Sequence, residues 1–218
     1  MDAIVHSTNE TFMDRGNLST RIVNLAGKEL KAELSQMEAC RTGEAKITPG
    51  YNLPARFIFH TVGPRYNAKY ENAAESALHG CYKSCLQAMK ENKIRTLGLC
   101  IINSVSRGYP QEHGAHVALR TVRKCLEIFH EDIDALIFAI DNDYEFDIYH
   151  RLMPLYFPRS QPELQLSAKK LEEDLGNEWG EKIIEDRVIR ISTFGSEETV
   201  AGLKLIPQLE ISQPQNFF

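Results

Sequence analysis

Strand and helix patterns alternate along the chain up to about residue 158, and this alternation restricts the fold more than any other feature of the sequence. Short apolar or β-branched runs are each followed by a longer segment whose apolar residues recur at every third or fourth position. The expected strands are 3–7, 56–62, 97–102 and 135–140, and the expected helices are 18–34, 73–89 and 112–128. Such alternation predicts an α/β fold in which helices cover both faces of a mixed sheet.

The first expected helix carries apolar side chains on one face, at Leu18, Ile22, Leu25, Leu30 and Leu34. We interpret residues 18–34 as a single amphipathic helix that continues through Gly27. Ser19 stands at its start and is a suitable N-cap, because a serine side chain can accept a hydrogen bond from a free backbone N–H group.

Composition limits the class of protein. The 218 residues are 43% apolar, enough for one sizeable core, but no apolar run is long enough to span a membrane. The opening MDAIVHSTNE lacks the basic and apolar regions of a secretory signal, and five cysteines without a CxxC pair fit a reducing compartment. Neither Cys81 with Cys85 nor His113 with His116 has the second ligand pair of a zinc site. We expect an intracellular protein, cytoplasmic or nuclear, with no metal and no cofactor.

The pattern changes after Ser160, where charged, glycine and serine residues dominate. Residues 158–218 carry 11 acidic and 7 basic side chains, which accounts for −4 of the net charge of −5. The sequence therefore predicts a folded domain over 1–158 and an acidic, mostly disordered tail over 159–218, in which 187–191 is the main apolar run. The nearly neutral domain gives no support to nucleic-acid binding through bulk charge.

The segment NSVSRGYP, residues 103–110, joins an apolar strand to an expected helix. A loop of this kind can hold a phosphate, because backbone N–H groups and a helix N-terminus favour negative charge. The alternative is that the segment is a simple turn between the strand and the helix.

Three segments resemble the signature of the macrodomain family, whose members bind ADP-ribose. They are DAIVHSTNE (2–10), CRTGEAKITPGYNLPARFIFHTVGP (40–64) and INSVSRGYP (102–110), and they occur in the family's order. The resemblance covers the chain from Asp2 to about Ser160 and implies a three-layer α/β/α fold around a mixed sheet. Since family domains begin with a further strand, the resemblance implies that this chain lacks the N-terminal strand or strands. We expect either a fragment or alternative product, or a sheet that closes without that strand and exposes an edge.

The resemblance also assigns ligand contacts. The residues so assigned are Asn9, Gly16, Asn17, Leu18, Ser104, Val105, Ser106, Arg107, Gly108 and Phe146. Asn9 corresponds to the asparagine that contacts the distal ribose, and its amide can donate to one hydroxyl and accept from another. The alternative is that Asn9 bonds the backbone of its own loop.

Several of these positions depart from the family pattern. Ser19 stands at the position of the aspartate that assists hydrolysis in some members, and a hydroxyl cannot replace that carboxylate as a base unless a partner activates it. Val105 replaces a phosphate-binding glycine, and a β-branched residue disfavours positive φ and brings Cβ towards the ligand. Arg107 could instead neutralise a phosphate. Phe146, or Tyr144, either stacks on adenine or packs the last helix onto the sheet.

Two functions from different classes follow. The first is a non-catalytic or weakly catalytic module that binds ADP-ribose, poly(ADP-ribose), an ADP-ribosylated protein or a poly(A)-like nucleic acid. The second is a protein-interaction scaffold that has lost ligand binding. A hydrolase is the least favoured reading because of Ser19, and the oligomeric state is not predicted. His60 is interpreted as a packed core residue rather than an acid or base.

Overall fold

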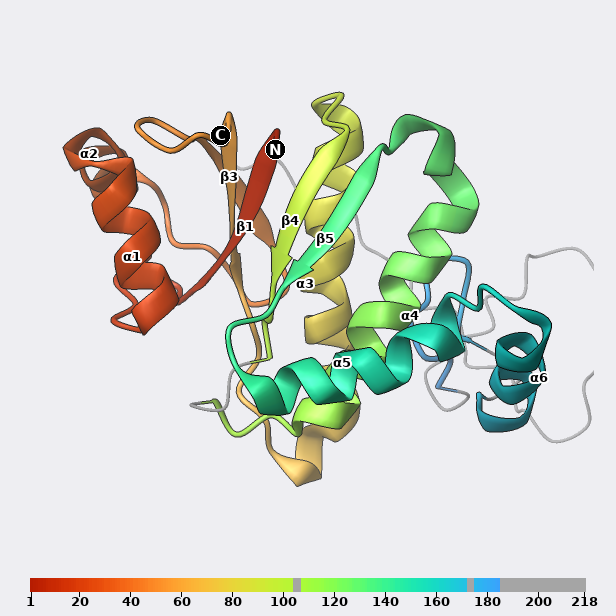
Figure 1. Ribbon diagram of the computed structural model, residues 1–218. Helices are drawn as coiled ribbons and strands as arrows, with labels where there is room; N and C mark the ends of the chain where they lie inside the picture. Colours follow the sequence, from red (N-terminus) through yellow and green to blue (C-terminus); the bar gives the residue numbers. More distant parts are fainter. Residues whose placement is uncertain (104–106, 172–174, 185–218) are drawn as a thin grey trace, which may run out of the picture. The chain divides into compact units, whose positions relative to one another are not determined.

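The computed structural model describes residues 1–103, 107–171 and 175–184 (Figure 1). Met1–Ile183 form one compact unit, and the second unit, Ile184–Phe218, is described only at Ile184. The apolar run 187–191 therefore lies outside the described residues. Within the described ranges, no helix is long and apolar enough to cross a membrane.

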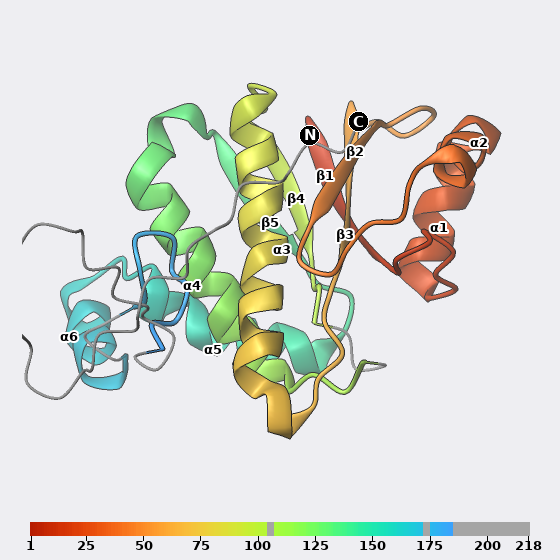
Figure 2. The same cartoon turned by 180° about the vertical axis from the view of Figure 1, so that it is seen from behind.

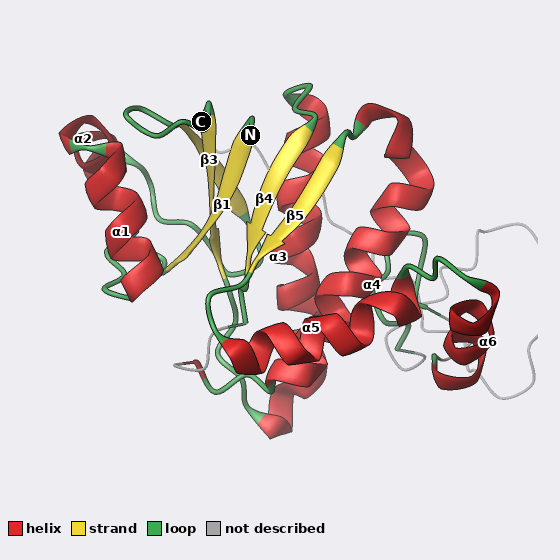
Figure 3. Cartoon of the chain, in the orientation of Figure 1, coloured by secondary structure: helices red, strands yellow, loops and turns green. Residues whose placement is uncertain are grey.

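Five strands form one mixed sheet in the order β2-β3-β1-β4-β5 (Figure 3). They are β1 (Ala3–Thr8), β2 (Ala45–Pro49), β3 (Phe57–Val62), β4 (Thr96–Cys100) and β5 (Ala135–Ala139). β1 pairs in parallel with β3 and with β4, and β4 pairs in parallel with β5. β2 pairs antiparallel with β3, so the expected mixed sheet is confirmed.

Helices lie on both sides of this sheet. The α-helices are α1 (Asn17–Ala26), α2 (Lys28–Gln36), α3 (Glu71–Glu91), α4 (Gln111–Phe129), α5 (Asp143–Tyr156) and α6 (Gln161–Lys170), and the short 3-10 helices are η1 (Ala68–Tyr70) and η3 (His130–Asp132). The opposite views of Figures 1 and 2 place α1 and α2 on one side of the sheet and α3 on the other. The three-layer α/β/α class is thereby confirmed.

Alternation along the strands divides the apolar side chains between two cores. Val5 and Phe59 face the larger core, which α3, α4 and α5 cover. Their neighbours Ile4 and Ile58 point to the opposite face and pack in a smaller core with α1 and α2. The period of two in a strand thus gives each helical layer its own apolar surface.

The expected single helix over 18–34 is two helices, so that prediction was wrong. Gly27 separates them with φ of 100° and ψ of −170°, a conformation that only glycine adopts readily. The expected N-cap was also wrong. Gly16 occupies the N-cap position of α1, and Ser19 lies inside the first helical turn and is only 2% exposed.

Residues 159–171 and 175–183 belong, by their contacts, to the same compact unit as the residues before them. Ser160 accepts a hydrogen bond from the N–H group of Glu163 and caps α6. Ser167 then donates to the carbonyl of Leu155 at 2.6 Å and ties α6 to α5. Trp179 packs against the larger core. These contacts depend on single capping and aromatic residues rather than on an apolar period, which is why composition suggested disorder.

Candidate functional site

The candidate residues follow the carboxyl ends of parallel strands. Asn9 comes directly after β1, Arg107 and Gly108 come after β4, and Phe146 lies in α5 after β5. In a parallel sheet these ends meet along one edge, where α/β proteins usually bind their ligands. The candidate residues 104–106, namely Ser104, Val105 and Ser106, lie outside the described residues.

Arg107 connects three of the segments at this edge. Its guanidinium donates to the carbonyl oxygen of Gly63 at 2.6 Å and to that of Thr8 at 3.2 Å. Thr8 is the last residue of β1, and Gly63 directly follows β3. Its own carbonyl accepts from the N–H group of Tyr66 at 3.0 Å. A carboxylate oxygen of Glu10 lies 3.7 Å from the guanidinium. The Arg107 side chain is mostly buried at this edge, with 16% of its surface exposed.

Asn9 organises the turn that follows β1. Its side-chain oxygen accepts from the N–H group of Met13 at 2.9 Å and from the Thr11 hydroxyl at 3.2 Å. The side-chain oxygen of Asn9 therefore bonds its own loop, which is the alternative role considered for this residue. Since both acceptor positions of that oxygen are used, the amide NH₂ is the group of Asn9 that can serve a ligand.

Gly16, Asn17 and Leu18 lie at the start of α1. This end has no side-chain cap and no acidic residue in its first turn. The first N–H groups of a helix have no partner within the helix, so they can bind an acceptor from outside. Gly108, after β4, has φ of 70°, and a Cβ atom at this position would meet nothing within 4 Å. Only its backbone conformation therefore requires glycine.

A buried chain of hydrogen bonds begins at Ser19. The Ser19 hydroxyl lies 2.7 Å from Nε2 of His6, and the Nδ1 atoms of His6 and His60 are 2.8 Å apart. Nε2 of His60 lies 2.9 Å from the Thr48 hydroxyl. His6 and His60 are fully buried, which confirms the core position expected of His60. The chain joins α1, β1, β3 and β2 in one row.

Both ends of this chain reach backbone carbonyls, so two proton arrangements satisfy it. Ser19 can donate to Asp14 at 3.2 Å, and Thr48 can donate to Pro49 at 3.1 Å. In one arrangement Ser19 donates to His6 and all the bonds run towards Pro49. In the other, Thr48 donates to His60 and all the bonds run towards Asp14. Each arrangement needs one proton between the two Nδ1 atoms, and therefore two neutral imidazoles.

The electrostatic surroundings agree with neutral rings. Burial lowers the pKa of His6 from 6.5 to about 4, against a smaller opposing effect of Asp14. Burial, together with the neighbouring His6, lowers the pKa of His60 to about 3. The chain can hold Ser19 firmly, but it keeps the hydroxyl inside the protein and away from solvent.

Phe146 lies near the start of α5, beside β5. Its ring is 54% exposed and stacks on His150, with centroids 5.7 Å apart. Together with Ile137 and Phe138 of β5 it lines an apolar groove between β5 and α5. Within the described ranges, no hydrogen bond, ion pair or ring contact joins Phe146 to Asn9 or Arg107.

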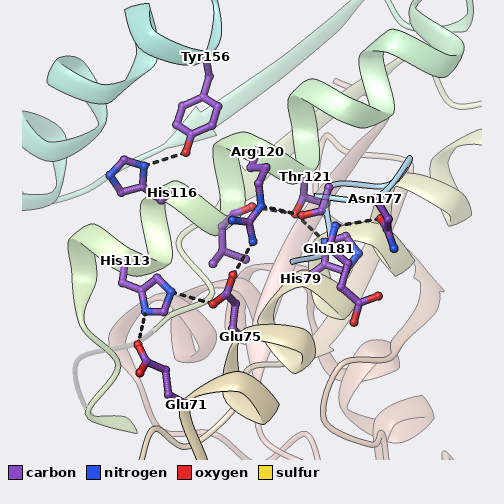
Figure 4. A network of polar contacts seen from close by, with 12 residues as sticks. Glu71, Glu75, His79, His113, His116, Arg120, Thr121, Tyr156, Asn177 and Glu181 are labelled. Carbon is purple, nitrogen blue, oxygen red and sulfur yellow. Dashed lines mark hydrogen bonds and ion pairs between the residues drawn. The ribbon is translucent and has the colours of Figure 1, made fainter. Parts of the chain in front are cut away.

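A second polar cluster lies between α3 and α4 (Figure 4). Glu75 accepts from Arg120 at 2.6 Å and lies 3.1 Å from Nε2 of His113, whose other nitrogen is 3.7 Å from Glu71. Burial alone would raise the pKa of Glu75, but the hydrogen bonds from His113 and Arg120 lower it to about 2. Tyr109, which follows the candidate loop, lies against the His113 ring at 5.7 Å. The cluster therefore supports the start of α4.

The same arginine fixes the segment 175–184. Nε of Arg120 donates to the carbonyl of Gly180 at 2.7 Å. The Asn177 side chain accepts from the N–H groups of Trp179 and Glu181 and closes the turn. Lys83 of α3 lies 4.8 Å from the centre of the Trp179 ring. These contacts hold the turn 177–181 against α3 and α4.

Among the described residues, neither a metal site nor an exposed thiol is found. Figure 4 shows His113 directed at Glu71 and Glu75 while His116 bonds Tyr156, so the two histidines do not converge. In the part of the chain that the structure describes, no group of three His, Cys, Asp or Glu side chains could hold a metal ion. All five cysteines are buried, and burial raises the pKa of Cys100 to about 12.

Sequence reasoning missed His6, Glu10, Thr8 and Gly63. The first had a detectable signal, because the runs IVHST and IFHTV share the order of apolar, histidine and hydroxyl residues. The parallel register of β1 and β3 places His6 directly beside His60. Thr8 and Gly63 left no signal, since they contact Arg107 through backbone carbonyls, which every residue carries.

Comparisons with known proteins agree with this architecture. The family profile described as "Macro domain" matches residues 5–118. Ganglioside-induced differentiation-associated protein 2 of Homo sapiens is 50% identical over 190 residues, which is 87% of this chain. The chain spans 38% of the length of that relative.

Solved structures are similar as well. The crystal structure of the macro domain of ganglioside-induced differentiation-associated protein 2 superposes with a TM-score of 0.71 and is 52% identical, covering 73% of this chain and 79% of that chain. The Trypanosoma brucei macrodomain in complex with ADP-ribose has a TM-score of 0.65 and is 33% identical, covering 70% of this chain and 63% of that chain.

Proposed function

The chain belongs to the Macro domain family, and from this premise we propose that it binds ADP-ribose, either free or attached to a protein, without hydrolysing it. The observation that carries the proposal is the likeness to a macrodomain in complex with ADP-ribose at 33% identity. It is supported by the position of Asn9 and Arg107 at the carboxyl edge of the sheet.

We assign each group at this edge to a part of ADP-ribose. The Asn9 amide donates to a ribose hydroxyl, and Arg107 neutralises the diphosphate. The uncapped N–H groups at Asn17 and Leu18 add donors for a phosphate or ribose oxygen. Gly108 keeps the backbone after β4 in a conformation that a side chain would disfavour. Ser104 and Ser106 contribute hydroxyl or backbone donors beside Val105.

The absence of hydrolysis is proposed from the state of Ser19. This residue is 2% exposed, and its hydroxyl is committed to His6. A general base must reach the attacking water, and Ser19 does not meet that requirement. His6 could activate Ser19 only by accepting its proton. The buried chain of hydrogen bonds from Ser19 to Thr48 does not lead that proton to a substrate.

Phe146 is the candidate for adenine recognition. The ring is exposed and available for stacking, which contributes roughly 1–3 kcal/mol per base. Its position against β5, however, also fits the packing role that was considered beside it. Substitution to alanine distinguishes the two, because a stacking role affects binding and a packing role affects stability.

Isothermal titration of the chain with ADP-ribose tests the proposal. The parent is expected to bind, Asn9→Ala is expected to weaken binding, and Asn92→Ala, at the far end of α3, serves as the control. Incubation with an ADP-ribosylated protein is expected to leave the modification in place. Poly(ADP-ribose) and poly(A) in parallel titrations identify the preferred class of ligand.

The alternative function is a ligand-silent scaffold for protein interactions. It is favoured by Val105 at a glycine position and by the use of the Asn9 oxygen within its own loop. A folded parent that does not bind, beside a Val105→Gly variant that does, would make this alternative the better account. Circular dichroism of each variant confirms that a silent protein is folded.

A further inference from the structure

Arg107 is held in place by neutral groups. Among the residues that the structure describes, its guanidinium donates to the carbonyls of Gly63 and Thr8, at 2.6 Å and 3.2 Å, and neither acceptor carries a net charge. These bonds fix the position of the cation between the ends of β1 and β3. They leave its positive charge to be balanced by something else.

The balancing group is loosely attached. Over residues 1–103, 107–171 and 175–184, the carboxylate that pairs with Arg107 is Glu10, at 3.7 Å. That distance is too long for a hydrogen bond, and the Glu10 side chain is 52% exposed while that of Arg107 is 16% exposed. Exposed ion pairs of this kind contribute little to stability. Arg107 is therefore a fixed cation with an easily displaced anion beside it.

Release of Glu10 requires no change in the backbone. Its carbonyl accepts from the N–H group of Cys40 at 2.9 Å, which anchors the main chain of the turn. The side chain extends from this anchored position into solvent and can turn away by side-chain rotation alone. The diphosphate of ADP-ribose carries two negative charges, against one for a carboxylate, and its oxygens can accept two N–H groups of a guanidinium together, so it competes well for the same place.

We propose that Glu10 is a built-in competitor for the phosphate of the ligand: its carboxylate balances Arg107 in the free protein and is displaced when a phosphate binds. This rests on the proposed function, because it concerns how the same site is regulated. Glu10 lowers the affinity for anions and prevents Arg107 from holding unrelated anions tightly. A ligand must therefore add contacts beyond a single charge in order to remain bound.

Calorimetric titration with two probes, ADP-ribose and inorganic pyrophosphate, tests this role. Glu10→Gln keeps the shape of the side chain and removes its charge, and it is expected to bind both probes roughly two- to five-fold more tightly than the parent. Glu91→Gln removes one charge from the exposed end of α3 and is expected to leave both affinities unchanged. Arg107→Gln is expected to weaken binding roughly tenfold or more.

The outcomes separate this inference from the proposed function. If the parent binds ADP-ribose but Glu10→Gln gains no more than Glu91→Gln, the competitor role is overturned and the proposed function stands. If no protein binds ADP-ribose while Glu10→Gln gains affinity for pyrophosphate, the proposed function fails and the competitor role stands. Tighter binding by Arg107→Gln would overturn the inference, because the arginine would then obstruct the site. Silence with both probes overturns both.

Discussion

Acidification should destabilise the protein through the buried pair of His6 and His60. Burial lowers the pKa of His6 from 6.5 to about 4 and that of His60 to about 3. The unfolded chain therefore takes up protons below about pH 6.5 that the folded protein does not bind. The stabilising effect of the neutral pair is complete above the unfolded pKa and is lost as the pH falls towards the folded values.

The magnitude follows from the number of protons. Each histidine that is neutral in the folded state and charged in the unfolded state adds about 1.4 kcal/mol per pH unit to the slope of unfolding free energy. Replacing His6 with asparagine removes one such group. The slope between about pH 6 and pH 4.5 should then fall by about 1.4 kcal/mol per pH unit, whatever the variant loses in packing.

Urea unfolding followed by circular dichroism at several pH values between about 7.5 and 4.5 measures this slope. His130→Asn, on the exposed start of η3, is the control and should retain the parent slope. Parallel slopes in the parent and in His6→Asn would refute the reasoning, since His6 would then bind its proton equally in both states. A rise in stability on acidification would refute the sign.

Three further substitutions test the structure. Arg120→Met should lower the unfolding free energy by about 3 kcal/mol, because the buried Glu75 carboxylate loses its arginine and keeps only His113 as a partner; a double variant with Glu75→Gln should recover part of the loss in urea unfolding. Gly27→Ala should cost about 2 kcal/mol in thermal unfolding, since φ of 100° disfavours any side chain, and an unchanged midpoint would contradict this. Ser19→Asp should destabilise the protein by about 2 kcal/mol at pH 7, with a smaller loss at pH 5, because the new carboxylate favours a protonated His6; equal losses at both pH values would argue against that contact.

The four parallel strands could be predicted from the sequence because each is a short run of apolar or β-branched residues that precedes a helical pattern. β2 could not, because Ala45–Pro49 places only Ile47 and Thr48 between the weak strand formers Ala45 and Lys46 and a terminal proline, and it depends on its pairing with β3. The break at Gly27 was hidden for a different reason. The helical period continues across it, and a single backbone conformation interrupts the helix without interrupting the pattern.

The candidate site was predictable in its order along the chain but not in its contacts. Asn9 and Arg107 could be placed at one sheet edge because parallel strands bring their carboxyl ends together. The bonds of Arg107 to Thr8 and Gly63 involve backbone oxygens, which a sequence does not distinguish from one another. The spare capacity of Asn9 likewise depends on the geometry of its own turn, which decides that its oxygen is already used.

The register of the sheet connects these findings. Because β1 and β3 run parallel, His6 lies beside His60, and each ring has only its far nitrogen for a further partner. The far nitrogen of His6 reaches the Ser19 hydroxyl in α1 at 2.7 Å. α1 is thereby fixed to the sheet through a polar contact as well as through its apolar face. The N-terminus of α1 has no side-chain cap, so its first N–H groups are available as the donors that the proposed binding requires.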